Sequence, residues 1–529
     1  MDPNLFPGCQ VAVVGAGVMG AGIAQVALLA GHPVRLYDIE DGTAASAARG
    51  LALALGRLAG KGKLAPADVE SALARLQVAD TLGELAGAAL VVEAVAEELA
   101  VKQRLMRELE AIVAPACVLA SNTSSLSITA IARGLESPGR VVGMHFFNPV
   151  PRMRLVEVVS GLETEVAVGD AVHSLARAWG KTAVRAKSTP GFIVNRIARP
   201  FYAEALALLH QQAAAPGMLD ACLRGAGFPM GPCELMDLIG HDVNFAVTRS
   251  VYDASFQDKR FQPSPLQREM VEGGLLGRKS GRGFYRYAEG GAGPGERSEG
   301  EAIAKAVNGQ APAALAEVPI ALSGDGPMAD LLAARLTAAG LGFGRDRRQP
   351  GTEVGLRIGS GLLMLTDGRC AGQRGAELGL ADVALFDRPF GPAAGFADGP
   401  PAALAYSVAQ QASPAFEALA AAALRALRWS PRRMSDVPGL AVARTIAMLI
   451  NEASDAVDQG VCDAGGADAA MTLGVNYPAG PFGWLAGWGA PAVVRLLDAL
   501  DAHHRGERYR VSPRLRRAAW ASMAPPAAR

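Results

Sequence analysis

The sequence predicts a doubly wound α/β sheet followed by an all-α domain, and then a degenerate second sheet unit with a second all-α domain. Three observations support this prediction. A glycine-rich loop comes directly after a short apolar strand near the start of the chain. Apolar strands and amphipathic helices then alternate up to about residue 187. Segments of the first half recur in the second half at nearly constant spacing.

Composition limits the classes of protein to which the chain can belong. It has 529 residues, and its 51 Lys and Arg balance its 51 Asp and Glu, so charge gives no reason to expect a nucleic acid or an anionic membrane as partner. Half of the residues are hydrophobic and 19% are charged, which excludes wholesale disorder. The six cysteines lie far apart without a Cys-x-x-Cys pair, so we expect no metal site, no disulfide framework and a cytoplasmic protein with reduced thiols.

One apolar stretch is long enough to cross a bilayer. Residues 11–31 carry no charge over 21 residues. Five glycines interrupt this stretch, and the ten residues before it hold Asp2 but neither Lys nor Arg, unlike a signal peptide. We therefore expect no membrane segment, because the glycine positions have a better explanation.

Those positions are typical of a dinucleotide-binding loop. Residues 10–14 read as a buried strand, Gly15, Gly17 and Gly20 follow in a G-x-G-x-x-G pattern, and a helical pattern runs to about residue 30. Gly15 would make the tight turn, Gly17 would let the backbone approach a pyrophosphate, and Gly20 would let the helix and strand pack closely. The helix N-terminus would offer its free N–H groups to the phosphates.

The second expected strand, residues 34–37, ends in Asp38. A carboxylate at this point can accept hydrogen bonds from both ribose hydroxyls and would repel a 2′-phosphate. The sequence therefore predicts a Rossmann-type domain that binds NAD rather than NADP.

The alternation of strands and helices continues beyond this unit. Further helices are expected at 43–59 and 97–113, and further strands at 90–95, 118–121, 141–145 and 155–159. Ligands of doubly wound sheets bind beyond the carboxyl ends of the strands. His145 and the segment Asn122–Ser125 follow strands at that edge, so we expect them to line the site.

His145 and Glu157 are the candidates for proton transfer. His145 ends one expected strand, and Glu157 lies twelve residues on in the next, after a short turn that contains proline. A neighbouring carboxylate fixes the tautomer of an imidazole and favours its protonated form. Dehydrogenation of an alcohol needs such a base, which removes the hydroxyl proton while hydride leaves the same carbon. Spacing alone leaves open a structural histidine that bonds a backbone carbonyl.

Several motifs together resemble the 3-hydroxyacyl-CoA dehydrogenase family, and they run in the family's order over residues 10–285. Besides the glycine loop they are Val92-Glu-Ala94 with Glu97 and Lys102, Ser121-Asn-Thr-Ser-Ser125, His145-Phe-Phe-Asn-Pro-Val-Pro151, Leu155-Val-Glu-Val158, Thr189-Pro-Gly-Phe-Ile-Val-Asn-Arg196, Pro229-Met-Gly-Pro-Cys-Glu-Leu235 and Gly277-Arg-Lys-Ser-Gly-Arg-Gly-Phe-Tyr285. The resemblance implies NAD-dependent oxidation of a (3S)-3-hydroxyacyl-CoA to the 3-oxoacyl-CoA.

The resemblance also implies a role for each matching residue. His145 would be the catalytic base, oriented by Glu157, while Ser124 and Asn195 would hydrogen-bond the oxygens of the substrate. The residues that would line the NAD site are Glu97, Lys102, Asn148 and Lys279. Lys61 would contact the coenzyme A moiety.

In its length, its second helical domain and its degenerate middle part, the chain resembles the members of this family that act in phenylacetate degradation. That resemblance implies 3-hydroxyadipyl-CoA, an acyl-CoA with a terminal carboxylate, as substrate. The general short-chain substrate 3-hydroxybutanoyl-CoA is the alternative.

We expect five segments along the chain. They are an NAD-binding Rossmann domain at 1–187, a helical substrate and dimerisation domain at 188–287, a linker at 288–316, a degenerate Rossmann-like domain at 317–430 and a second helical domain at 431–529. The first helical domain is predicted to start with Thr189 as N-cap and Pro190 in the first turn. The degenerate unit should have strands near 318–322, 362–366 and 383–387 and a helix at 328–339. Ala329 stands where its third loop glycine would be, so we expect no NAD there.

The two helical domains have the sequence signature of a repeat. Residues 437–444 match 189–196 at an offset of 248, and Glu452 falls opposite Glu204 in the same frame. Ala443 stands in place of Asn195, and its methyl group cannot hydrogen-bond a substrate. We therefore expect a structural second copy that packs on the first as an intrachain pseudo-dimer, with a homodimer as the alternative.

Two other functions compete with the dehydrogenase. A Rossmann reductase of small free hydroxy acids would lack the Ser121–Ser125 and His145–Pro149 motifs. A non-enzymatic NAD-binding relative would have lost part of the set that carries the chemistry. All four members of that set, Ser124, His145, Glu157 and Asn195, are present.

Overall fold

The computed structural model describes residues 8–287, 315, 317–345, 353–394 and 400–523. They form two compact units, one made of residues 1–196 and 456–475 and the other of residues 197–455 and 476–529. The expected linker, 288–316, lies outside the described residues except for Leu315, which is buried in the core of the second sheet.

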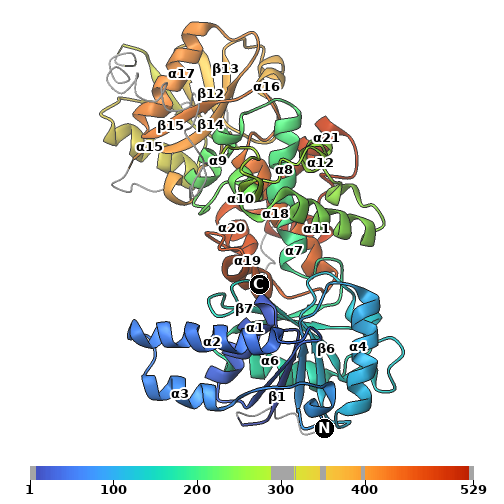
Figure 1. The fold of residues 1–529 in the computed structure, drawn as a ribbon. Coiled ribbons are helices and arrows are strands. Elements are labelled where there is room, and N and C mark those ends of the chain that lie inside the picture. Colours follow the sequence, from blue (N-terminus) through green and yellow to red (C-terminus); the bar gives the residue numbers. More distant parts are fainter. Residues whose placement is uncertain (1–7, 288–314, 316, 346–352, 395–399, 524–529) are drawn as a thin grey trace, which may run out of the picture. The chain divides into compact units, whose positions relative to one another are not determined.

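The first unit is built on an eight-stranded sheet (Figure 1), with the order β3-β2-β1-β4-β5-β6-β7-β8. The strands are β1 (Val11–Val14), β2 (Val34–Tyr37), β3 (Leu76–Val78), β4 (Leu90–Glu93), β5 (Val118–Ser121), β6 (Val141–Phe146), β7 (Leu155–Ser160) and β8 (Thr182–Lys187). The strands β1 to β6 run parallel, whereas β7 pairs antiparallel with β6 and parallel with β8. The central strands are buried along their whole length, as expected for a parallel sheet covered on both faces.

The helices of this unit connect the strands in the doubly wound pattern. They are α1 (Val18–Leu29), α2 (Thr43–Gly60), α3 (Pro66–Ala74), α4 (Leu99–Ile112), α5 (Ile128–Ile131), α6 (Val166–Ala178) and α7 (Val194–Ile197). The helices α2 and α3 pack on each other and extend from the sheet as an arm (Figure 1). A further helix, α19 (Ala464–Gly474), packs on β7 and β8 although it comes from the second half of the chain.

The second unit contains a seven-stranded sheet with the order β10-β9-β11-β12-β13-β14-β15. Its strands are β9 (Ile320–Ser323), β10 (Gly344–Arg345), β11 (Gly355–Ile358), β12 (Gly361–Leu365), β13 (Val383–Phe386), β14 (Ala402–Val408) and β15 (Trp429–Arg433), and its helices are α15 (Pro327–Ala338), α16 (Ala371–Leu378) and α17 (Pro414–Ala426). An antiparallel hairpin, β11–β12, interrupts the parallel order. The predicted degenerate Rossmann-like fold is thus confirmed.

The remaining helices of the second unit come from both halves of the chain. From the first half these are α8 (Arg199–His210), α9 (Pro216–Gly225), α10 (Pro232–Ile239), α11 (His241–Ala254) and α12 (Pro265–Glu272); from the second half, α18 (Val442–Asp458), α20 (Pro481–Trp488), α21 (Ala490–His504) and α22 (Pro513–Met523). Within the described ranges, no helix is both long and apolar enough to span a membrane.

The predicted helix start at Thr189 is wrong. The chain turns at residues 190–193, and the helix α7 begins only at Val194. Gly191 and Phe192 have φ of +74° and +46°, in the left-handed region, which a right-handed helix cannot contain. The N-terminal N–H groups of α7 are capped by a carboxylate from the sheet and not by Thr189.

Two predicted boundaries near the site also differ from the structure. The strand β4 ends at Glu93 and not at Val95, because the Glu93 carboxylate accepts the Val95 N–H at 2.7 Å and turns the chain. The next helix begins at Leu99 instead of residue 97. Glu97 therefore lies in a loop, from which it can reach the segment after β5.

Candidate active site

The glycine loop between β1 and α1 has the geometry that its spacing predicts. Gly15 has φ of +96°, and a Cβ atom there would lie 2.5 Å from the carbonyl oxygen of Ala94. A Cβ on Gly20 would lie 1.7 Å from the oxygen of Gly15. A Cβ on Gly17, at the N-cap of α1, would meet nothing described within 4 Å. The open space at a helix N-terminus fits the pyrophosphate of NAD.

Asp38 follows β2 and lies beside this loop. Its Oδ2 accepts the N–H of Ala16 at 2.6 Å, and its Oδ1 accepts the N–H of Glu40 at 3.0 Å. The carboxylate is thus fixed next to the phosphate-binding turn, where the ribose of a dinucleotide would lie.

His145 and Glu157 face each other on the antiparallel strands β6 and β7. Their register pairs the two residues directly, and His145 Nδ1 lies 2.6 Å from Glu157 Oε2. Both side chains are buried. Because the carboxylate accepts the hydrogen on Nδ1, the lone pair is assigned to Nε2, the nitrogen that can receive a substrate proton.

The second oxygen of Glu157 anchors the neighbouring helix. It accepts the backbone N–H groups of Ile193 and Val194 at 3.1 and 2.9 Å, at the start of α7. This cap brings Asn195 beside the loop after β5, where its amide donates to the carbonyl oxygen of Ser124 at 3.3 Å. One carboxylate therefore positions both the histidine and the asparagine-bearing turn.

Glu97 organises the loop after β5. Its Oε1 accepts the backbone N–H of Ser124 at 2.8 Å and the hydroxyls of Thr123, Ser124 and Ser125 at 2.8 to 3.2 Å. Burial alone would raise the pKa of Glu97, but Lys102 and these hydrogen bonds outweigh burial and lower it. Glu97 is thus ionised at neutral pH and holds the Ser124 hydroxyl.

Lys102, predicted to line the NAD site, is buried between two carboxylates. Its ammonium lies 2.6 Å from Glu93 and 3.3 Å from Glu97. The nearer carboxylate also accepts the hydroxyl of Ser121. This arrangement links α4 to the ends of β4 and β5, so Lys102 fixes the orientation of Glu97.

Six of the predicted residues line one cavity of about 370 Å³ at the carboxyl edge of the first sheet. They are Glu97, Lys102, Ser124, His145, Asn148 and Asn195. Met19, from the helix that follows the glycine loop, lines it as well. The predicted dinucleotide loop and the predicted catalytic residues therefore lie around the same space.

Two predicted residues lie elsewhere. Lys61 is the C-cap of α2, on the exposed arm, and does not line this cavity. Lys279 belongs to the second unit, where its ammonium pairs with Asp242 at 2.5 Å.

Two further residues support the site, Asn122, which was expected at this edge as part of the segment Asn122–Ser125, and Phe147, which was not singled out from the sequence. Asn122 accepts the N–H of Phe146 at 2.9 Å and so joins the loop after β5 to the end of β6. Phe147 lies 4.5 Å from the His145 ring, centroid to centroid, and lines the cavity. Phe147 falls inside the motif His145–Pro151, and membership of that motif is the one sequence signal that could have found it.

The strands of the second copy do not carry a pair equivalent to His145 and Glu157. Asp387 follows β13 and donates its N–H to the carbonyl oxygen of Ala405, the pairing that His145 and Glu157 have in the first copy. The Asp387 carboxylate accepts the N–H groups of Ala441, Val442 and Ala443 directly. Burial raises its pKa to about 6. The capping carboxylate thus stands at the position that His145 has in the first copy, and no imidazole stands there.

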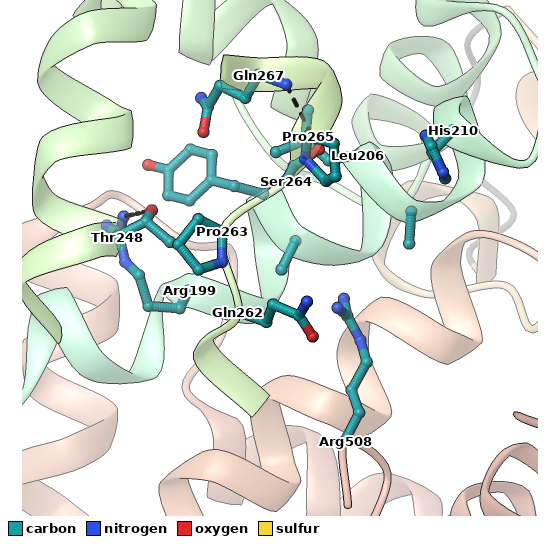
Figure 2. Close-up of a pocket in the computed structure, with 13 residues that line it drawn as sticks. Arg199, Leu206, His210, Thr248, Gln262, Pro263, Ser264, Pro265, Gln267 and Arg508 are labelled. Atoms are coloured by element: carbon teal, nitrogen blue, oxygen red, sulfur yellow. Dashed lines mark hydrogen bonds between the residues drawn. The ribbon is translucent and has the colours of Figure 1, made fainter. Parts of the chain in front are cut away.

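The second unit also contains a smaller cavity of about 140 Å³ between α8, α11 and α12. Figure 2 shows Arg199 donating to Thr248, a hydrogen bond of 3.1 Å, and the N-cap Ser264 below Gln267. No predicted site residue lines this cavity. Within the described residues, no group of three or more His, Cys, Asp and Glu side chains could hold a metal ion.

Three family models match the chain. One described as "3-hydroxyacyl-CoA dehydrogenase, NAD binding domain" matches residues 10–189. The "3-hydroxyacyl-CoA dehydrogenase, C-terminal domain" matches residues 191–287 and again 439–524, as the repeat predicts. The "3-hydroxybutyryl-CoA dehydrogenase reduced Rossmann-fold domain" matches residues 363–438.

Individual proteins match at both full and half length. The chain is 41% identical over 516 residues to the 3-hydroxyadipyl-CoA dehydrogenase of Escherichia coli K12, covering 96% of this chain and 97% of that protein. It is 43% identical to a probable 3-hydroxybutyryl-CoA dehydrogenase of Bacillus subtilis, covering 53% of this chain and 98% of that protein. A crystal structure titled 3-hydroxybutyryl-CoA dehydrogenase from Escherichia coli K12 superposes with a TM-score of 0.83 at 40% identity, covering 98% and 99% of the two chains.

Proposed function

The chain belongs to the 3-hydroxyacyl-CoA dehydrogenase family, and from this premise we propose that His145 is the base of an oxidation whose substrate is 3-hydroxyadipyl-CoA. The enzyme is an NAD-dependent oxidoreductase, as its family is. The observation that carries the residue assignment is the His145–Glu157 pair, which lies at the wall of a cavity that Ser124 and Asn195 also line.

In this mechanism, Nε2 of His145 takes the proton of the substrate's 3-hydroxyl. NAD, when bound at the glycine loop, would supply the acceptor for the hydride of the same carbon. Glu157 holds the tautomer and stabilises the imidazolium that forms. The Ser124 hydroxyl and the Asn195 amide hold the reacting oxygen and the thioester carbonyl, so the proton donor and the base are oriented before reaction.

The proposed NAD-binding residues at the β1–α1 turn and the end of β2 are Gly15, Gly17, Gly20 and Asp38. The residues proposed to line the nicotinamide end are Glu97, Lys102 and Asn148. We further propose that Lys279 contacts NAD and that Lys61 contacts coenzyme A. Glu97 supports this assignment best, since it binds the same loop that carries Ser124. Lys102 would act through Glu97, because its ammonium is already paired.

The adipyl substrate is supported by the relative that matches almost the whole chain. The 3-hydroxybutanoyl alternative is supported by the half-length relative and by the name of the solved structure. NADH formation with both thioesters distinguishes them. We expect a higher kcat/KM for the adipyl compound, and a higher value for the butanoyl compound would overturn the proposal.

We also propose the five-segment organisation predicted above, a cytoplasmic location and an intrachain pseudo-dimer. All six cysteines are free, which supports a reducing compartment. The pseudo-dimer is supported by reciprocal ion pairs. Glu204 pairs with Arg508 at 2.8 Å, and Glu452 pairs with Arg260 at 3.0 Å. Glu452 lies 248 residues after Glu204, and Arg508 lies 248 residues after Arg260, so the two pairs are related by the repeat offset.

A further inference from the structure

The helix α19 of the second copy lies on the catalytic sheet of the first. It packs against β7 and β8, in the same compact unit as the active site. Just before it, the carbonyl oxygen of Val461 accepts the N–H of Lys187 at 2.9 Å, and Gln459 accepts a hydrogen bond from Arg196 at 2.8 Å. The contact is thus fixed by hydrogen bonds at the ends of β8 and α7.

The repeat makes this contact reciprocal. The helix α9 of the first copy, which corresponds to α19, packs on β14 of the second sheet, which corresponds to β7. At both contacts a glycine meets the start of the strand. A Cβ on Gly225 would lie 2.5 Å from the oxygen of Ala403, and one on Gly474 would lie 2.7 Å from Leu155 Cδ2. The helix α19 of the second copy thus packs on the first sheet, and the equivalent helix α9 of the first copy packs on the second sheet.

We infer that Gly474 is a positioning residue for the catalytic histidine, a conclusion that rests on the proposed role of His145. A Cβ at Gly474 would also lie 3.1 Å from Val194 Cγ2 and 3.8 Å from Phe147 Cε1. Phe147 packs on the His145 ring, and Val194 precedes Asn195. A Cβ at Gly474 is therefore too close to Leu155 and Val194 and in ordinary contact with Phe147, so a larger side chain there would push on the supports of both residues. The second copy thus contributes a packing contact to the site of the first, although Asp387 stands where it would have a histidine.

Gly474→Val tests the inference in the full-length enzyme. A displacement of the reacting groups by about 1 Å costs as much as a hundredfold in rate, so we expect kcat to fall roughly ten- to a hundredfold while the Kd for NAD stays unchanged. The matched control is Gly465→Val on the same helix, where a Cβ would meet only Asp463 Oδ1 at 3.6 Å. Gly474→Ala combined with Leu155→Val, which removes the nearest clashing methyl group, should recover most of the activity that Gly474→Ala alone loses.

A second measurement is independent of turnover. The imidazole NMR signals of His145, identified by their loss in His145→Gln, should shift in Gly474→Val and not in Gly465→Val. Unchanged signals together with unchanged kcat in Gly474→Val would overturn the inference. A wild-type enzyme that oxidises no 3-hydroxyacyl-CoA would instead refute the proposed function, while the NMR comparison would still decide whether Gly474 positions His145.

Discussion

At the residue scale, the proposed catalysis depends on a short hydrogen-bonded chain. Glu157 uses one oxygen for His145 and the other for the N–H groups that begin α7. A single buried side chain thus sets the distance between the base and Asn195. The second copy lacks this chain of contacts, because Asp387 caps the equivalent turn from the histidine's own position and Ala443 replaces the asparagine.

His145→Gln is expected to lower kcat while leaving NAD binding intact. Glutamine cannot accept the substrate proton, and general-base catalysis contributes roughly 10²- to 10⁴-fold. His145 lies at the end of β6, whereas the glycine loop follows β1. The strands β4 and β5 lie between them in the sheet, so the nucleotide loop should be unaffected. Stopped-flow NADH formation and the Kd for NAD measure the two effects. A variant that retains most of its turnover would refute the assignment of the base.

Asn195→Ala makes the first copy resemble the second at one position. The substrate would lose one hydrogen-bond donor, which should reduce kcat/KM by about two- to tenfold, because a neutral hydrogen bond contributes roughly 0.5–1.5 kcal/mol. The control is the reverse change, Ala443→Asn, which should not raise activity because Asp387 and not a histidine lies beside this position. Equal activity in Asn195→Ala and the parent enzyme would remove Asn195 from the substrate site.

At the scale of elements, a buried ion pair joins α8, which carries Glu204, to α18, which carries Arg444. Glu204 on α8 is fully buried and accepts hydrogen bonds from Arg508 at 2.8 Å, Arg444 at 2.5 Å and the Tyr509 hydroxyl at 3.1 Å. Burial alone would raise the pKa of Glu204, but the two guanidinium groups lower it to about 2. The folded state therefore favours the ionised carboxylate.

The sign of this shift predicts acid lability. A carboxyl whose pKa is lower in the folded than in the unfolded state stabilises the fold above its unfolded value, and that stability is lost as pH falls toward 2. Between pH 7 and pH 3 the parent should lose roughly 2 kcal/mol through Glu204 alone. Glu204→Gln should be less stable at pH 7, because it leaves two arginines without their carboxylate, and should show a weaker loss over this range.

Urea unfolding followed by tryptophan fluorescence at pH 7, 5 and 3 measures this difference. Glu272→Gln serves as the control, since Glu272 pairs with Arg268 on the surface with more than half of each side chain exposed. Identical pH dependence in Glu204→Gln and the parent would show that the buried cluster is not the acid-sensitive element.

Sequence periodicity predicted the elements themselves well, because strands and helices of a doubly wound sheet have strong apolar patterns. It also placed His145 and Glu157 on neighbouring strands, and the antiparallel register then pairs them. The start of α7 was missed because the left-handed turn at Gly191 and Phe192 depends on a cap from Glu157 that is distant in sequence. Likewise, only the fold brings Glu97 to the loop after β5.

At the scale of the whole molecule, each copy of the repeat places one helix on the sheet of the other copy. The repeat could be recognised from sequence, but an apolar helix face does not reveal which sheet it covers, so the exchange of α9 and α19 could not be predicted. The segments Phe228–Pro232 and Tyr477–Pro481 match each other at an offset of 249, one residue out of frame with the rest of the repeat. Their first residues, Phe228 and Tyr477, pack with ring centroids 5.0 Å apart, as equivalent residues do at a two-fold axis. This contact supports the proposed intrachain pseudo-dimer.

The first half made alone should rebuild this symmetry with a second copy of itself. Residues 1–287 lack α19, so β7 and β8 would be exposed, and α9 would lack β14. In a dimer, α9 of each protomer can cover β7 and β8 of the other, because Gly225 and Gly474, 249 residues apart, approach the equivalent strand positions Ala403 and Leu155. We expect light scattering to show a dimer that retains dehydrogenase activity. Gly225→Trp in the same fragment should prevent the close approach and give an inactive monomer, whereas a monomeric, fully active fragment would show that the catalytic sheet does not need this helix.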